Sequence, residues 1–173
     1  MVTEKEFNEL KRRVEKLEEQ IKELIGESTK PILTFSYEEK MTIFAKTIGI
    51  SLENLRSIIK VDTENYEVFI LKPIIGKNEE EKQFKTSLVI LTVYKNIFNR
   101  DEILSQKLRT ILEKHGIKSL INLSTNLSKH KQYIIPKGKP KSSKYKYKLT
   151  LPGENKGKEL IKELVTSDKN EIF

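Results

Sequence analysis

Lysine side chains concentrate in one stretch of this 173-residue chain, where they could bind a polyanion. Residues 114–153 contain no aspartate or glutamate but ten lysines: Lys114, Lys118, Lys129, Lys131, Lys137, Lys139, Lys141, Lys144, Lys146 and Lys148. The whole chain carries a net charge of +8, so its other residues are slightly acidic in sum. One concentrated basic stretch is the electrostatic footprint of a protein that binds a phosphate-rich partner. A solvated lysine-rich surface is the alternative, although glutamates usually alternate with lysines on such surfaces.

Amide and hydroxyl side chains accompany the lysines at the spacing of one helix face. In residues 119–129 three leucines fall on one side of a predicted helix: Leu120, Leu123 and Leu127. The opposite side carries Asn122, Thr125, Asn126 and Lys129. In the major groove of DNA an asparagine amide can both donate to and accept from an adenine. This face of residues 119–129 therefore carries side chains that are compatible with a groove of DNA.

A basic loop follows this helix. Residues 137–144 (KGKPKSSK) lie between two runs rich in β-branched and aromatic residues, QYIIP and YKYKLT, and this pattern predicts a β-hairpin with a basic tip. A lysine is a point charge without the bidentate fork of arginine, so these lysines suit phosphates more than base edges. We expect the tyrosines of the hairpin to pack it rather than to stack on bases: Tyr133, Tyr145 and Tyr147.

Two further helices are predicted before the helix over residues 119–129. Residues 79–98 form a long helix with periodic apolar residues. Asp101 is expected to N-cap the second helix, which ends at His115 and Gly116. Its buried stripe would consist of Ile103, Leu104, Leu108, Ile111 and Leu112.

The closing stretch YKYKLTLPGENKGKELIKEL resembles a segment that recurs in winged helix-turn-helix DNA-binding proteins. In that segment a strand ending in Leu-Thr is followed by a short turn containing glycine and by a final helix. The resemblance covers residues 79–165, about half the chain, and points to no particular family. The order of three helices, a hairpin and a helix agrees with it independently.

Carried over by position, the resemblance implies that residues 119–129 are the recognition helix, which enters the major groove, and that residues 137–144 form the wing. The implied partner is double-stranded DNA. The residues expected to contact DNA are Lys118, Asn122, Thr125, Asn126, Lys129, Lys131, Lys137, Lys139, Lys141, Lys144 and Lys146.

The N-terminal residues carry the heptad pattern of a coiled coil. Its apolar positions are Phe7, Leu10, Val14, Leu17, Ile21 and Leu24. β-Branched residues at a and leucine at d favour two parallel strands, so we expect a parallel homodimer through residues 3–25. The alternative is an amphipathic helix that packs on the chain's own core. Residues 1–26 would form this segment, before a linker.

Residues 33–77 form a smaller region with two predicted helices, 37–47 and a Ser51-capped helix through Ile59, followed by a strand over residues 66–75. Ala45 and Gly49 have the spacing of a helix-turn-helix, and a structural helical hairpin is the other interpretation. The expected fold class is mainly α with a small β component (α+β), divided into a coiled-coil helix 1–26, the region 33–77 and a winged helix 79–165.

Several classes of function are disfavoured by the residues present. The chain has no cysteine, so disulfides and thiolate metal sites are excluded. Its two histidines, His115 and His130, show no metal-ligand spacing, and no glycine loop has the phosphate-binding pattern of the P-loop. We therefore expect no enzyme activity, no cofactor and no metal. No signal peptide or membrane span is indicated, which favours the cytoplasm.

The expected function is DNA binding by a dimeric transcriptional regulator, or by a chromatin or architectural factor, associated with the nucleoid. The alternative is a non-enzymatic adaptor whose winged helix binds proteins in a coiled-coil assembly. RNA binding is less consistent with the sequence, because no aromatic platform or paired glycine clamp is present.

Overall fold

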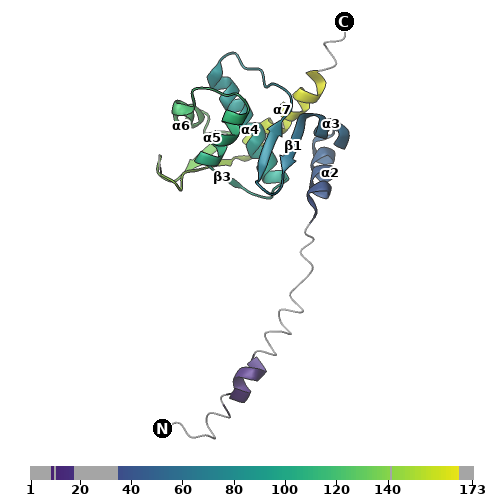
Figure 1. Ribbon diagram of the computed structural model, residues 1–173, viewed down its shortest axis with the longest axis vertical. Coiled ribbons are helices and arrows are strands. Elements are labelled where there is room, and N and C mark those ends of the chain that lie inside the picture. Colours follow the sequence, from purple (N-terminus) through teal and green to yellow (C-terminus); the bar gives the residue numbers. More distant parts are fainter. Residues whose placement is uncertain (1–8, 10, 18–34, 141, 168–173) are drawn as a thin grey trace. The chain divides into compact units, whose positions relative to one another are not determined.

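The computed structural model describes residues 9, 11–17, 35–140 and 142–167 (Figure 1). The chain divides into two units, Met1–Phe35 and Ser36–Phe173. In the first unit, residues 9 and 11–17 are helical, and Val14 and Leu17 are exposed. The other predicted dimerisation residues lie outside the described part: Phe7, Leu10, Ile21 and Leu24.

The second unit begins with two helices, as the sequence predicts. Helix α2, Tyr37–Ile48, is N-capped by Ser36, whose side chain accepts from the Glu39 backbone in a capping box. It ends at Gly49, whose φ of 73° provides the left-handed C-cap. Helix α3, Leu52–Ile58, follows at once, and the Ser51 side chain caps it by accepting from the Asn54 backbone.

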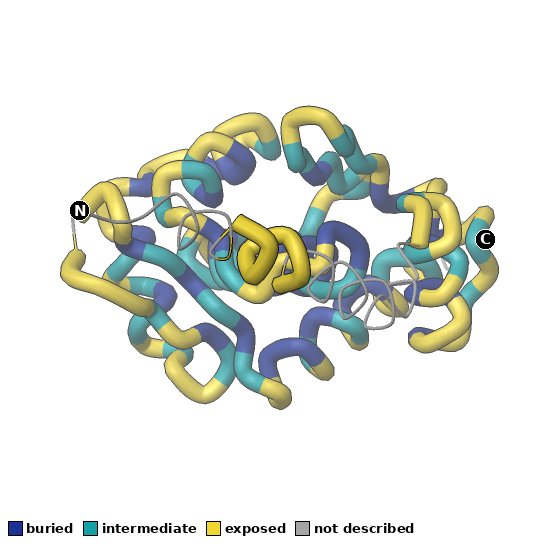
Figure 2. The backbone as a smooth tube through the Cα atoms, turned by 90° about the horizontal axis from the view of Figure 1, so that it is seen from below, coloured by how far each residue is buried: buried dark blue, intermediate teal, exposed yellow. Residues whose placement is uncertain are grey.

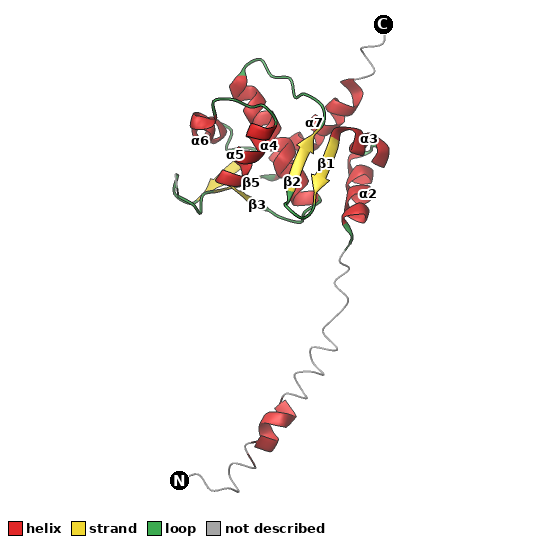
Figure 3. Cartoon of the chain, viewed as in Figure 1, coloured by secondary structure: helices red, strands yellow, loops and turns green. Residues whose placement is uncertain are grey.

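A two-stranded sheet follows α3, where one strand was predicted. Strand β1, Ile59–Asp62, pairs antiparallel with β2, Glu67–Ile70. The predicted second helix through Ile59 is thus one residue too long, because Ile59 already has extended backbone angles. Strand β2 stops short of the predicted end at residue 75. Figure 3 shows this hairpin, in which β1 contacts α3 and β2 contacts α5, Ser105–Lys114.

Helix α4, Glu79–Asn96, is the central element of the unit. Asn78 caps it by accepting from the Glu81 backbone, and residues 86–94 are all buried. It packs closely against α7, Leu151–Thr166. This approach requires a glycine, because a Cβ atom at Gly157 would overlap the Thr92 hydroxyl oxygen of α4.

A three-stranded antiparallel sheet contains the predicted hairpin and one strand that was not predicted. Strands β4, Ile134–Lys137, and β5, Lys146–Leu149, are the hairpin, and β3, Glu102–Leu104, completes the order β3-β5-β4. The prediction that a helix starts after Asp101 is wrong, because Ile103 pairs with the buried Tyr147 of β5. Pairing with a distant strand overrides the local helical pattern.

The candidate recognition helix is shorter and less regular than predicted. A 3-10 turn η1, Leu120–Asn122, leads into α6, Leu123–Ser128. Ser119 lies outside the helix, with a left-handed φ of 59°. The predicted glycine turn before the last helix is absent, because α7 begins directly after β5 and contains Gly153 in its first turn.

The fold is mixed α and β, with helices and two small antiparallel sheets around one core. Buried residues of α2 and α3 join the same cluster as those of α4, α5, α6 and α7. Figure 2 shows buried stretches alternating with exposed ones along the helices of the unit. The described parts of the regions 33–77 and 79–165 therefore belong to one compact unit.

Candidate nucleic-acid interface

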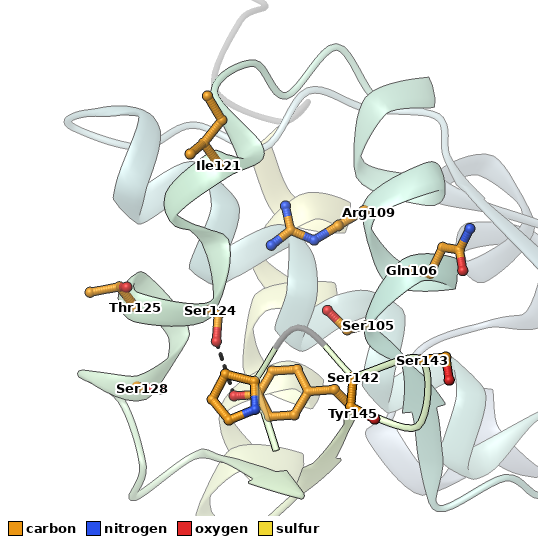
Figure 4. Close-up of a pocket in the computed structure, with 11 residues that line it drawn as sticks. Ser105, Gln106, Arg109, Ile121, Ser124, Thr125, Ser128, Ser142, Ser143 and Tyr145 are labelled. Atoms are coloured by element: carbon orange, nitrogen blue, oxygen red, sulfur yellow. Dashed lines mark hydrogen bonds between the residues drawn. The ribbon is translucent and has the colours of Figure 1, made fainter. Parts of the chain in front are cut away.

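A cleft of about 680 Å³ opens between the first half of α5, the η1–α6 segment and the loop joining β4 to β5 (Figure 4). Most of the residues that line it have a polar group, and many of these groups are hydroxyls. Among the described lining residues Arg109 is charged and none is acidic. The lining residues are Ser105, Gln106, Arg109, Ile121, Ser124, Thr125, Ser128, Pro140, Ser142, Ser143 and Tyr145.

Arg109 is held across the cleft by a backbone contact. Its guanidinium reaches from α5 toward the η1–α6 segment and donates to the carbonyl oxygen of Leu120 (Figure 4). Within the described residues no carboxylate pairs with Arg109. One guanidinium nitrogen bonds that carbonyl, and the other N–H groups remain for a ligand on this side of the cleft.

The sequence did not lead us to Arg109, because it lies outside the acid-free stretch. The available signal was its position on the polar face of the second predicted helix, three residues after Gln106 and opposite the buried Leu108 and Ile111. The same signal would have found Ser105 and Gln106.

Gln83 of α4 fixes the start of the candidate recognition helix. Its side chain is 1% exposed, and its Nε2 donates to the carbonyls of Lys118 and Ser119 at 3.2 and 3.3 Å. Its Oε1 accepts from the Nδ2 of Asn126 at 2.9 Å. Asn126 is therefore half-buried and bonded to α4, whereas Asn122 and Thr125 are exposed.

Acidic residues from outside the basic stretch neutralise part of it. Lys129 pairs with Glu80 at 2.9 Å, and Glu67 pairs with Lys114 at 2.5 Å. Asp101 lies 3.6 Å from Lys148. The absence of acids between residues 114 and 153 thus does not make the surface there uniformly positive, because the fold supplies carboxylates from earlier segments.

Glu102 on β3 holds two of the lysines that were expected to contact DNA. It contacts Lys137 of β4 and lies 3.3 Å from Lys146 of β5. Hydrogen bonds from Lys137 and then from Lys146 lower the pKa of the Glu102 carboxyl. Because side chains alternate along β5, Lys146 and Lys148 point away from the face that buries Tyr147 and Leu149. Lys137 and Lys146 therefore lie on the outer face of the sheet, away from the cleft.

Four predicted lysines are exposed and make no ion pair within the described residues: Lys118, Lys131, Lys139 and Lys144. Lys139 and Lys144 flank the cleft-lining residues of the β4–β5 loop, and Lys118 lies three residues before Ile121. Lys141 lies outside the described residues. These four lysines are the ones whose charge is available to a partner.

The tyrosines of the hairpin pack inward, as predicted. Tyr145 and Tyr147 are buried and meet edge to face, with ring centroids 5.3 Å apart. The hydroxyl of Tyr145 accepts from Ser124 at 3.0 Å and so joins the hairpin to α6. Tyr133 is half-buried and packs against Phe84. Burial raises the pKa of the Tyr147 hydroxyl.

Both histidines have structural partners. The backbone N–H of Ile70 donates to Nε2 of His115 at 2.8 Å, so the ring proton resides on Nδ1 and is donated to the Ile111 carbonyl. The ring of His130 stacks on that of Phe84, with the ring centroids 3.9 Å apart. In the part of the chain that the structure describes, no three His, Asp or Glu side chains gather as metal ligands would. No helix among those residues combines the length and apolar character needed to cross a bilayer.

Comparisons of the chain with known protein families, with curated proteins and with solved structures find no match. Function must therefore be inferred from the geometry and electrostatics of the cleft.

Proposed function

We propose that residues 79–165 are a winged helix module that binds double-stranded DNA, with the η1–α6 segment in the major groove and the β4–β5 loop as the wing. The order of elements supports this proposal. Along the chain the order of elements is α4, β3, α5, the η1–α6 segment, β4 and β5. In the sheet the order of strands is β3-β5-β4. Such an arrangement presents one helix and one hairpin loop on the same side of the unit.

The acid-free cleft is the observation that carries the proposal. Hydroxyl groups and Arg109 line it, and side chains of these types make most contacts to phosphate and sugar in protein–DNA complexes. The first turn of α5 also reaches the cleft through Ser105 and Gln106, has no acidic residue and has no side-chain cap. Its amide groups and positive dipole end favour an anion there.

The four unpaired lysines add long-range attraction to the cleft. Lys139 and Lys144 adjoin residues that line it, Lys118 lies three residues before the lining residue Ile121, and Lys131 follows α6. Each phosphate that a lysine neutralises releases condensed counterions, which favours binding at low salt. We assign these lysines to positioning the module on DNA, and the exposed Asn122 and Thr125 to contacts with base edges.

We further propose that the chain acts as a parallel homodimer through residues 3–25. The exposed Val14 and Leu17 support this, because apolar side chains at the a and d positions become buried when two such helices pair. Two modules in one dimer would bind two half-sites with high effective concentration. Such a dimer fits a transcriptional regulator or an architectural factor.

A protein-binding adaptor is the second candidate function. The observation in its favour is the outer face of the three-stranded sheet, where Leu104 is 43% exposed and Ile135 is 42% exposed. These apolar side chains lie among the lysines held by Glu102, on the side away from the cleft. A partner on that face would leave the cleft open.

A binding titration with a fluorescent duplex at several salt concentrations tests DNA binding. Changing the four unpaired lysines (Lys118, Lys131, Lys139 and Lys144) to alanine should flatten the plot of log affinity against log salt by about three to four units per module.

The control changes four other exposed lysines without ion pairs to alanine. They lie on α2, on β1, in the loop before α4, and on α7, and are Lys46, Lys60, Lys77 and Lys162. Both variants lose the same charge. Equal effects of the two variants, or no binding to any duplex at low salt, would exclude DNA binding through this surface.

A further inference from the structure

The segment that we place in the major groove carries an apolar side chain at an unusual position. Ile121 is 89% exposed on the 3-10 turn that begins it. Thr125 follows four residues later, is also exposed, and lines the same cleft (Figure 4). An isoleucine and the methyl group of a threonine thus line the same cleft, on the η1–α6 side.

Hydrogen bonds from two side chains fix the backbone of the turn that carries Ile121. Gln83 bonds the carbonyls of Lys118 and Ser119, and Arg109 bonds that of Leu120. Leu120 and Leu123, on either side of the exposed pair 121–122, are buried. The packing of the unit therefore does not use the Ile121 side chain, and its apolar surface is available to a partner.

We propose that Ile121, assisted by the methyl group of Thr125, contacts the 5-methyl group of a thymine in the major groove. The proposal rests on DNA binding by this module and specifies what the module reads. The thymine methyl is the apolar feature of the major groove, and it contacts apolar side chains there. Lys118 and Arg109 nearby make a polyanion the occupant that fits the charge around Ile121.

Duplexes that differ only in this methyl group test the proposal without knowledge of a preferred site. Alternating dA–dT and alternating dA–dU duplexes of equal length are compared, together with alternating dG–dC duplexes with and without 5-methylcytosine. The full chain should bind each methyl-bearing duplex more tightly, by about three- to five-fold for every methyl group that is buried.

The Ile121→Ala variant should bring both affinity ratios close to one. Thr125→Ser removes the threonine methyl and keeps its hydroxyl, so it should reduce the ratios, whereas Thr125→Val keeps the methyl and should retain them. Ile75→Ala is the matched control, because Ile75 is 80% exposed and does not line the cleft. Thermal unfolding of each variant reports whether the fold is intact.

Equal binding of the methylated and unmethylated duplexes by the unaltered chain would overturn the methyl contact while leaving DNA binding in place. An Ile121→Ala variant that keeps the full ratios would do the same. Absence of binding to every duplex at low salt would instead overturn DNA binding and the methyl contact together.

Discussion

The Oε1 atom of Gln83 accepts a hydrogen bond of 2.9 Å from the Nδ2 atom of Asn126, and this bond ties α6 to the central helix α4. The same buried glutamine also donates to the backbone before α6. One side chain thus sets the position of the segment that we place in the major groove.

Replacing Gln83 by leucine should lower both stability and DNA affinity without changing charge. Its partners would lose three hydrogen bonds, and the free energy of unfolding should fall by about 1 to 3 kcal/mol. Urea denaturation measures the first effect and duplex titration the second. The Gln106→Leu variant is the control for stability, because Gln106 is exposed. Unchanged DNA affinity in a Gln83→Leu variant that has lost stability would show that α6 does not enter the groove.

Asn122 and Asn126 should differ in their contribution to sequence-specific recognition of bases. Asn122 is exposed, so Asn122→Ala should cost about 1 to 3 kcal/mol of binding free energy on a preferred duplex and little on a scrambled one. Asn126→Ala should lower stability through the lost bond to Gln83 and weaken both duplexes alike. Preferred duplexes come from selection with the purified protein. If Asn122→Ala weakens both duplexes equally, binding is insensitive to sequence and the chain is an architectural factor.

Glu102 should not restrain DNA binding, because the two lysines that it holds lie on the outer face of the sheet, away from the cleft. The Glu102→Gln variant releases Lys137 and Lys146, and its duplex affinity should rise only as much as the loss of one negative charge explains, without a steeper salt dependence. The Glu53→Gln variant removes the same charge from an exposed position on α3 and serves as the control. If Glu102→Gln raises affinity more than Glu53→Gln does, with a steeper salt dependence, then the outer face of the sheet also contacts DNA.

Glu154 should make stability depend on pH. Burial raises the pKa of its carboxyl, but hydrogen bonds from Lys158 at 2.6 Å and Lys95 at 2.5 Å outweigh burial and leave the pKa below the usual 4.5. Because the pKa is lower in the folded chain, its stabilisation is present above about pH 4.5 and is lost as the pH falls through the folded value.

The Glu154→Gln variant should therefore be less stable than the unaltered chain by about 1 to 3 kcal/mol at neutral pH. The difference should shrink as the pH falls below 4.5, the usual pKa of a glutamate carboxyl. Urea denaturation from pH 7 to pH 3 measures it, with Glu159→Gln as an exposed control on the same helix. A difference in the free energy of unfolding that stays constant over this range would show that the charge of Glu154 does not stabilise the fold.

Disruption of the heptad should yield monomers. Changing Val14 and Leu17 to aspartate places charges at the proposed dimer seam, and the variant should sediment as a monomer at tens of micromolar. Deletion of residues 1–26 should have the same effect. Unaltered protein that already sediments as a monomer at this concentration would exclude the homodimer and leave DNA binding by single modules.

Local sequence signals predicted the elements that depend on local interactions. The helix predicted over residues 37–47, the predicted cap at Ser51 and the periodicity of residues 79–98 correspond to α2, α3 and α4, and the basic hairpin is present. Strand β3 was missed because its three residues are strand only through pairing with β5, more than 40 residues later. A short apolar run such as Ile103-Leu104 fits a helix equally well until its partner is known.

The candidate interface was predicted only in part, for an electrostatic reason. A count of charges along the chain found the ten lysines but could not find Glu80 and Glu102, which reach them through the fold. It could not find Arg109 either, because an arginine among nearby acidic residues has no distinctive local pattern. Asn126 was assigned to the exposed face because helical spacing does not reveal a buried partner such as Gln83.

The close approach of α7 to α4 also bears on how the chain folds during synthesis on the ribosome. Within the described residues α7 follows all the other elements, yet it packs against α3 and α4, which precede it by many tens of residues. Until Gly157 has left the ribosomal exit tunnel, α4 cannot bury the side around Leu88 and Thr92. The unit should therefore fold after translation of α7, and a nascent chain stalled before residue 151 would display apolar surface that chaperones recognise.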